Sequence, residues 1–152
     1  MKFLPVFLLL AACGGSGSQN FDRNVYVNVV QGFPHGSASY TQWAGRDPAV
    51  IEVSDSVMGA DEDYLDALLM HELVHACTRT TGHDSDSSCY TYEGGLPVPY
   101  VHPPCPAEIA KVQATTGTFI LHSFDFWLVD NVVWAATEWN TWAGRTVFVV
   151  NP

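Results

Sequence analysis

The chain has 152 residues, of which 47% are hydrophobic and 12% aromatic, so it can bury the core of one globular domain. Sixteen acidic residues against six basic ones give a formal net charge of −10. Because an acidic surface repels phosphate and the basic residues are scattered along the chain, we expect no nucleic-acid partner.

The first twenty residues are typical of a secretion signal followed by a tether. Lys2 precedes an apolar run over residues 3–10 that is too short to cross a bilayer, and small residues follow it. Leu10-Ala11-Ala12-Cys13 resembles a bacterial lipobox, which implies cleavage before Cys13 and lipid attached to that cysteine. We therefore predict a signal peptide at 1–12, a lipid-anchored Gly/Ser tether at 13–20 and one domain at 21–152.

This N-terminus also predicts a location. Gly14, rather than an aspartate, after the cysteine resembles outer-membrane sorting in Gram-negative cells. We expect a protein exported across the inner membrane and held at the outer membrane or cell surface through lipid on Cys13 only. Loss of residues 1–12 would remove one basic residue, Lys2, and leave five basic and sixteen acidic residues, a formal charge of −11.

The first half of the domain alternates between strand and loop signals. Asn24 to Val30 is rich in β-branched residues and alternates in polarity, which predicts a strand. Residues 31–41 contain glycine, proline and hydroxyl residues without periodicity and are expected to form a loop. A second strand is expected from Ala49 to Val53, after the Asp47-Pro48 break.

A helix over residues 61–78 carries the most specific pattern in the chain. His71 and His75 stand four residues apart with Glu72 directly after the first. On a helix this spacing places both imidazoles on one face, where they can bind the same zinc ion, and Glu72 can act as general base toward its water. Apolar residues recur at three- and four-residue spacing and support the helix: Leu65, Leu68, Leu69, Leu73 and Val74.

The second half is expected to contain an irregular loop, two helices and a strand. Five prolines and two adjacent glycines predict an ordered loop over residues 83–106. Pro106 introduces a helix near 107–117, and a further helix near 126–142 precedes a strand from Thr146 to Val150. The later helix has an apolar stripe: Leu128, Val132, Ala135, Trp139 and Trp142. The chain therefore predicts a small α+β domain with a short mixed sheet packed on the helix that carries the histidines.

Three cysteines remain after Cys13. Cys77 lies two residues beyond His75, about 200° around the helix, and should face the core. One disulfide is compatible with an exported protein. We expect it to join Cys89 to Cys105.

The order of motifs after residue 49 resembles the metzincin zinc metalloproteases, with the matrixin-like branch most similar. The similarity rests on the His-Glu-x-x-His helix, a glycine beside His83, an acidic and serine-rich stretch at 84–88, and a closing helix at 107–117. The resemblance implies a zincin-like fold with His71, His75 and His83 as zinc ligands. The chain departs from the family in two places: His83 stands eight residues after His75 instead of six, and Cys89 replaces the methionine beneath the metal.

A catalytic zinc takes three protein ligands, and alternatives to His83 remain open. Asp84 or Asp86 would give an aspartate-type site, and Glu93 or Glu108 a glutamate-type site. His35, His102 and His122 lack metal-ligand spacing. Tyr90 or Tyr92 could donate to an oxyanion, although a packing role is expected first.

The function implied is zinc-dependent hydrolysis of peptide bonds in a peptide or protein substrate, by a monomer, with Glu72 as general base. A non-catalytic or degenerate zinc-binding surface lipoprotein is the alternative. Metzincins carry a long helix between their first two strands, but the loop at 31–48 leaves no room for one. We therefore expect the helix near 126–142 to occupy that place and residues 146–150 to join the sheet of residues 25–30.

Overall fold

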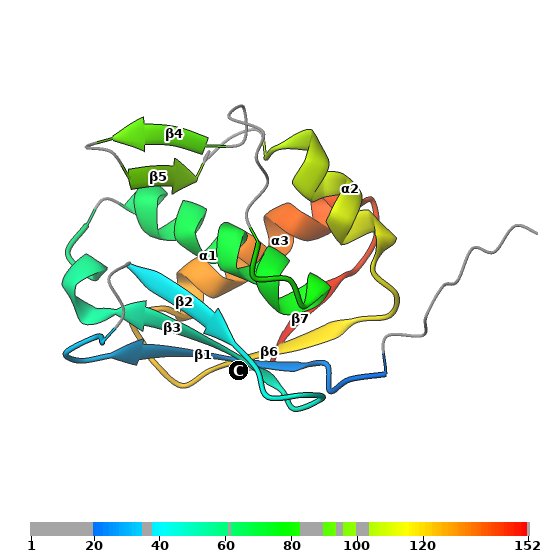
Figure 1. The fold of residues 1–152 in the computed structure, drawn as a ribbon, viewed down its shortest axis with the longest axis horizontal. Coiled ribbons are helices and arrows are strands. Elements are labelled where there is room, and N and C mark those ends of the chain that lie inside the picture. Colours follow the sequence, from blue (N-terminus) through cyan, green and yellow to red (C-terminus); the bar gives the residue numbers. More distant parts are fainter. Residues whose placement is uncertain are drawn as a thin grey trace, which may run out of the picture.

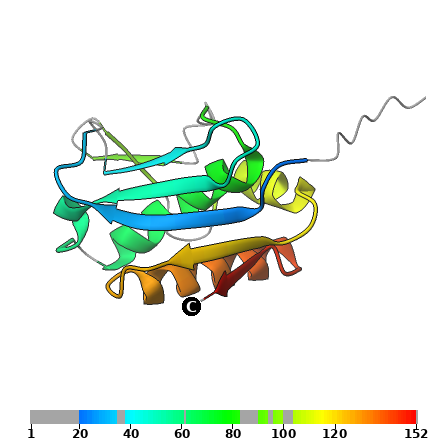
Figure 2. The ribbon, with the colours of Figure 1, turned by 90° about the horizontal axis from the view of Figure 1, so that it is seen from below.

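The computed structural model describes residues 20–34, 38–60, 62–82, 90–93, 96–99 and 104–151. Within them, one mixed five-stranded sheet carries three helices on one face, so the domain is α+β, as the sequence predicted. Figure 1 shows the sheet as a lower layer and the helices above it, with a small hairpin at the upper left, and Figure 2 shows the sheet from below, in front of the helices.

The sheet has the strand order β2-β3-β1-β6-β7. Its centre is β1 (Asn24–Val30), which is parallel to both β3 (Ala49–Ser54) and β6 (Phe119–Ser123). At one edge β7 (Phe148–Asn151) is parallel to β6, and at the other β2 (Ser39–Gln42) runs antiparallel to β3. The predicted strands β1 and β3 are present, and the predicted strand at 146–150 is present with its start two residues later.

Two strands of the sheet were not predicted. β2 overlaps the end of the expected loop at residues 31–41 and extends one residue beyond it, to Gln42. β6 lies between the two C-terminal helices. β2 has only four residues, and its buried positions are a serine and a threonine, so the apolar alternation used to predict strands is missing. The expected loop at 83–106 also contains a hairpin, β4 (Tyr90–Glu93) and β5 (Leu96–Pro99).

The three helices lie close to their predicted positions in the sequence. α1 (Glu62–Thr78) is the expected histidine-bearing helix, and a short 3₁₀ turn η1 (Asp55–Val57) leads into it from β3. α2 (Pro106–Ala114) ends three residues before the predicted end at Gly117, because the hydroxyl of Thr115 bonds the carbonyl of Val112 and turns the chain. α3 (Val129–Ala143) ends at Gly144, which has the left-handed φ of 68° that favours glycine.

The core lies between the helices and the inner face of the sheet. Alternate strand residues, including Val25, Ile51 and Phe119, are fully buried beneath α1 and α3. α3 packs along α1, where the Trp139 indole Nε1 donates to the carbonyl of Met70 at 2.8 Å. The tail helix and β7 therefore belong to the same core and sheet as β1, as predicted.

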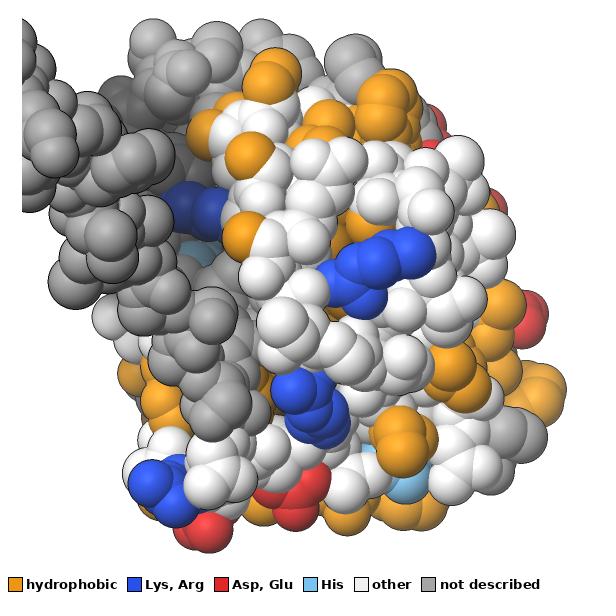
Figure 3. All heavy atoms as spheres, turned by 90° about the vertical axis from the view of Figure 1, so that its right-hand side faces the viewer, with side chains coloured by type: hydrophobic (Ala, Val, Ile, Leu, Met, Phe, Trp, Pro, Cys, Tyr) orange, Lys and Arg blue, Asp and Glu red, His pale blue; other side chains and the backbone are white. Residues whose placement is uncertain are grey.

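Several basic side chains hold loops together. Arg145 Nη2 donates to the Thr115 carbonyl at the end of α2, and Arg79 Nη2 donates to the Asp22 carbonyl at 2.7 Å. Burial lowers the pKa of Arg79, whose guanidinium lies 4.3 Å from the centroid of the Phe21 ring. On the face seen in Figure 3 the Lys and Arg side chains are separated from one another by uncharged and hydrophobic groups.

No helix among the described residues is long and apolar enough to cross a membrane.

Candidate metal centre

The two histidines of α1 converge on one point. His71 and His75 are each 8% exposed, and their rings lie at 89° to one another. Their Nε2 atoms are 3.0 Å apart. Two nitrogen ligands about 2.0–2.1 Å from one zinc ion would lie about 3.0–3.4 Å apart, so this separation fits two ligands of a single ion.

The other ring nitrogen of each histidine faces an oxygen acceptor. His75 Nδ1 lies 2.6 Å from the carbonyl oxygen of Thr80, which can only accept, so Nδ1 carries a proton and, in the neutral ring, Nε2 has the lone pair. His71 Nδ1 lies 3.7 Å from Glu108 Oε1 on α2. A carbonyl or carboxylate that is hydrogen-bonded to a metal-binding histidine fixes its tautomer and ring orientation. The Thr80 contact is such a hydrogen bond, whereas the Glu108 contact has only an ion-pair distance.

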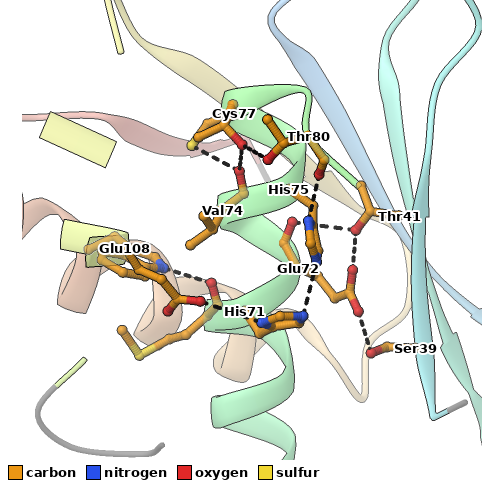
Figure 4. A network of polar contacts seen from close by, with 12 residues as sticks. Ser39, Thr41, His71, Glu72, Val74, His75, Cys77, Thr80 and Glu108 are labelled. Carbon is orange, nitrogen blue, oxygen red and sulfur yellow. Dashed lines mark hydrogen bonds and ion pairs between the residues drawn. The ribbon is translucent and has the colours of Figure 1, made fainter. Parts of the chain in front are cut away.

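Glu72 lies beside the histidines and is only 4% exposed. Its Oε1 accepts a hydrogen bond from the Ser39 hydroxyl at 2.6 Å, and its Oε2 accepts one from the Thr41 hydroxyl. Figure 4 shows the carboxylate between the imidazoles and β2, the strand that supplies both hydroxyls. The carboxylate is thus both near the candidate metal position and tied to the edge of the sheet.

The predicted third ligand lies outside the described residues. His83, Asp84 and Asp86 fall in the gap at 83–89, and nothing is described of the Glu93 side chain. Glu108 faces Nδ1 of His71, on the opposite side of the ring from Nε2, so its place is that of an orienting partner rather than of a ligand between the two Nε2 atoms. Within the described ranges no group of three or more His, Cys, Asp or Glu residues is arranged to hold a metal.

The cysteines divide into two kinds. Cys105 is disulfide-bonded, and its predicted partner Cys89, like the lipidation candidate Cys13, lies outside the described part of the chain. Cys77 is a free thiol with no exposed surface, facing the core as predicted. Burial raises the pKa of Cys77 to about 12, so the thiol is protonated at neutral pH.

Sequence reasoning missed three residues that surround the site. Ser39, Thr41 and Thr80 all contact the His-Glu-x-x-His residues, yet they lie on segments without apolar periodicity. The only signal was the Ser-x-Thr spacing at 39 and 41, which puts two hydroxyls on one face of a strand. His122, which lacked metal spacing, accordingly lies elsewhere and bonds Asn24 Oδ1 at 2.8 Å.

A cavity of about 620 Å³ opens away from the histidines. It lies at the carboxyl ends of β1 and β6, beside the first turns of α1 and α3. None of the candidate site residues lines this cavity. Its lining residues are Val29, Gln31, Met58, Ala60, Glu62, Leu65, Asp125, Trp127 and Asn131.

Comparison of the chain with protein-family models, with curated proteins and with solved structures gave no match.

Proposed function

We propose that the chain is a zinc-dependent endopeptidase whose site is built on α1. One observation carries the proposal: the Nε2 atoms of His71 and His75 lie 3.0 Å apart, while the Nδ1 atom of each ring faces an oxygen of Thr80 or Glu108. Without a metal the two Nε2 atoms can share one hydrogen bond, and with a metal the same arrangement supplies two oriented ligands.

The roles of the chain's own residues follow from this geometry. His71 and His75 would hold the zinc, and His83 is proposed as the third ligand. When bound, zinc polarises the substrate carbonyl and lowers the pKa of its water toward neutrality. Glu72 would accept the proton of the attacking water on its carboxylate and return it to the leaving amine.

The topology supports a zincin-like arrangement with an altered chain order. Metzincins carry a long helix between their first two strands, and no helix lies between β1 and β3 in the described residues 31–34 and 38–48. Here β6, α3 and β7 form a parallel strand–helix–strand unit in which α3 packs along α1. We propose that α3 occupies the place of the family's early helix and covers the same face of the sheet.

The experiment is metal analysis combined with hydrolysis of an unfolded protein and of a peptide library. Wild-type protein should contain one zinc per chain and cleave both substrates. Glu72→Ala should keep the zinc and lose hydrolysis, whereas His83→Ala should lose the zinc. Full zinc retention by His83→Ala would move the third ligand to another residue.

A non-catalytic zinc-binding lipoprotein remains the second candidate. It is favoured by the spacing of eight residues from His75 to His83, in place of the family's six, and by Cys89 in place of the family's methionine. Wild-type protein that binds one zinc and cleaves neither substrate would establish it in place of the enzyme.

We also propose that lipid on Cys13 holds the protein at the outer membrane or cell surface. Wild-type protein should partition into detergent and incorporate labelled fatty acid, and Cys13→Ser should do neither. Correctly processed wild-type protein that remains in the aqueous phase would contradict this location.

A further inference from the structure

Two hydroxyl residues on β2 face the carboxylate of Glu72. Ser39 and Thr41 are two positions apart, point to the same side of the strand, and are 7% and 5% exposed. Each contacts a different oxygen: Ser39 Oγ lies 2.6 Å from Oε1, and Thr41 Oγ1 contacts Oε2 (Figure 4).

The sheet fixes where these hydroxyls lie. Ser39 pairs with Val53 and Thr41 with Ile51 in the antiparallel ladder of β2 and β3. Ser39 and Thr41 are the two buried positions of β2, so a slip of one residue against β3 would turn both hydroxyls to the outer face of the sheet. The hydroxyls are therefore rigid donors, and α1 brings the carboxylate to them.

A carboxylate as buried as that of Glu72 needs hydrogen-bond donors to offset its desolvation. One donor would satisfy part of this need but would leave the group free to swing about that oxygen. Donors on both oxygens determine the plane of the carboxylate as well as its position. The two hydroxyls together therefore fix the orientation of the carboxylate, which one hydroxyl alone would not do.

We propose that Ser39 and Thr41 are positioning residues that hold the Glu72 carboxylate in its orientation beside the His71–His75 pair. This inference rests on the proposed hydrolytic function. A general base must be held within about 0.5 Å of its productive place, and a misplacement of about 1 Å can cost about a hundredfold in rate. The hydroxyls act through the carboxylate that they bond, so their loss should lower turnover rather than substrate binding.

The test uses the full zinc-loaded chain with Ser39→Ala, Thr41→Val and the double variant. We expect kcat to fall about tenfold for each single change and about a hundredfold for the double variant, with KM within about twofold of wild type and one zinc retained. Thr41→Ser restores a hydroxyl at the same place and should keep kcat within about threefold. Ser123→Ala is the matched control, because Ser123 is also a buried strand serine but has no hydrogen-bond partner within the described structure.

A second readout does not depend on turnover. With Co²⁺ in place of zinc, the visible absorption of the metal reports its ligands, including the bound water that the Glu72 carboxylate would contact. The double variant should shift this spectrum, whereas Ser123→Ala and Thr41→Ser should not.

The outcomes separate the two proposals. A double variant with wild-type kcat in an active enzyme overturns the positioning role and leaves the proposed function intact. A wild-type protein that binds zinc but hydrolyses nothing overturns the proposed function instead. In that case the cobalt spectrum decides the positioning role: a shift in the double variant supports it, and an unchanged spectrum overturns it.

Discussion

Cys77 shows how burial sets the chemistry of a single residue. It lies on α1 two residues beyond His75, yet it has no exposed surface and its Sγ faces only the Val74 carbonyl at 3.5 Å. Desolvation of the thiolate raises the pKa of Cys77 to about 12, from an ordinary value of 9.0. The thiol is therefore neutral in the folded protein at any physiological pH.

We predict that iodoacetamide at pH 8 leaves Cys77 unmodified in the folded protein and alkylates it once urea unfolds the chain. Because the folded pKa is raised, the protonated thiol contributes stability that is present below about pH 9 and is lost as the pH rises toward about 12. The difference in unfolding free energy between wild type and Cys77→Ala should shrink over that window. Peptide mapping by mass spectrometry measures the alkylation, and rapid labelling of native protein would contradict the prediction.

Gly117 is a second residue whose role is set by its surroundings. Its φ is 73°, and a Cβ at this position would meet Arg23 Nη1 at 2.5 Å. That guanidinium lies 5.4 Å from the centroid of the Phe119 ring and donates to Thr116 Oγ1 at 3.3 Å. A side chain at 117 would displace it.

Gly117→Ala should therefore cost about 1–2 kcal/mol for the left-handed backbone and about 0.5–1 kcal/mol more for the displaced cation–π contact. Gly45→Ala is the control, because Gly45 also has a positive φ, 53°, but nothing lies within 4 Å of its Cβ position. Urea unfolding should show Gly117→Ala as the less stable of the two. In an Arg23→Ala background this difference should disappear, and its persistence would mean that Arg23 is not the cause.

At the scale of elements, α3 has one buried and one partly exposed tryptophan. Trp139 is fully buried and donates to the Met70 carbonyl on α1, next to His71. Trp142 was expected in the same apolar stripe but is 37% exposed. Both positions lie on the same face of the helix as Ala135, but Trp142 is in the last turn of α3, which ends at Ala143, so less of the protein covers it.

Trp139→Ala should destabilise the protein by about 3–5 kcal/mol, because it leaves a large cavity between α1 and α3. Trp142→Ala, on the same helix, should cost less than about 1 kcal/mol. Thermal and urea unfolding measure both. Similar losses for the two variants would contradict the packing of α3 on α1 described above.

The elements that the sequence predicted carry a local signal, which is an apolar period, a run of β-branched residues or a proline at the helix start. α1, α3 and β1 have enough alternating or helical positions for their buried faces to be recognised. β2 and β6 were not predicted, because β2 buries hydroxyls in place of apolar side chains and β6 has only five residues between two helices. The site followed the same division: His71, Glu72 and His75 were readable from local spacing, but Ser39 and Thr41 reach it only through tertiary pairing of β2 with β3.

At the scale of the whole molecule, the sheet brings segments from both ends of the chain together. β1, near residue 24, is hydrogen-bonded to β6 at residues 120–123, and β6 in turn to β7. All three helices lie on one face of this sheet, with α1 in contact with α2, α3 and β2. The elements that contribute Ser39, Thr41 and Glu108 therefore surround the histidines from separate parts of the sequence.

Calorimetric titration of metal-free protein with Zn²⁺ tests whether His71 and His75 are two ligands of one zinc ion. Wild-type protein should bind one equivalent, and His71→Ala and His75→Ala should each weaken binding by more than about a hundredfold, because a lost ligand costs more than the tenfold to hundredfold of a lost orienting partner. His122→Ala is the control, because His122 bonds Asn24 on the sheet and lies apart from the pair. Wild-type zinc affinity in both α1 variants, or a comparable loss in His122→Ala, would contradict the account.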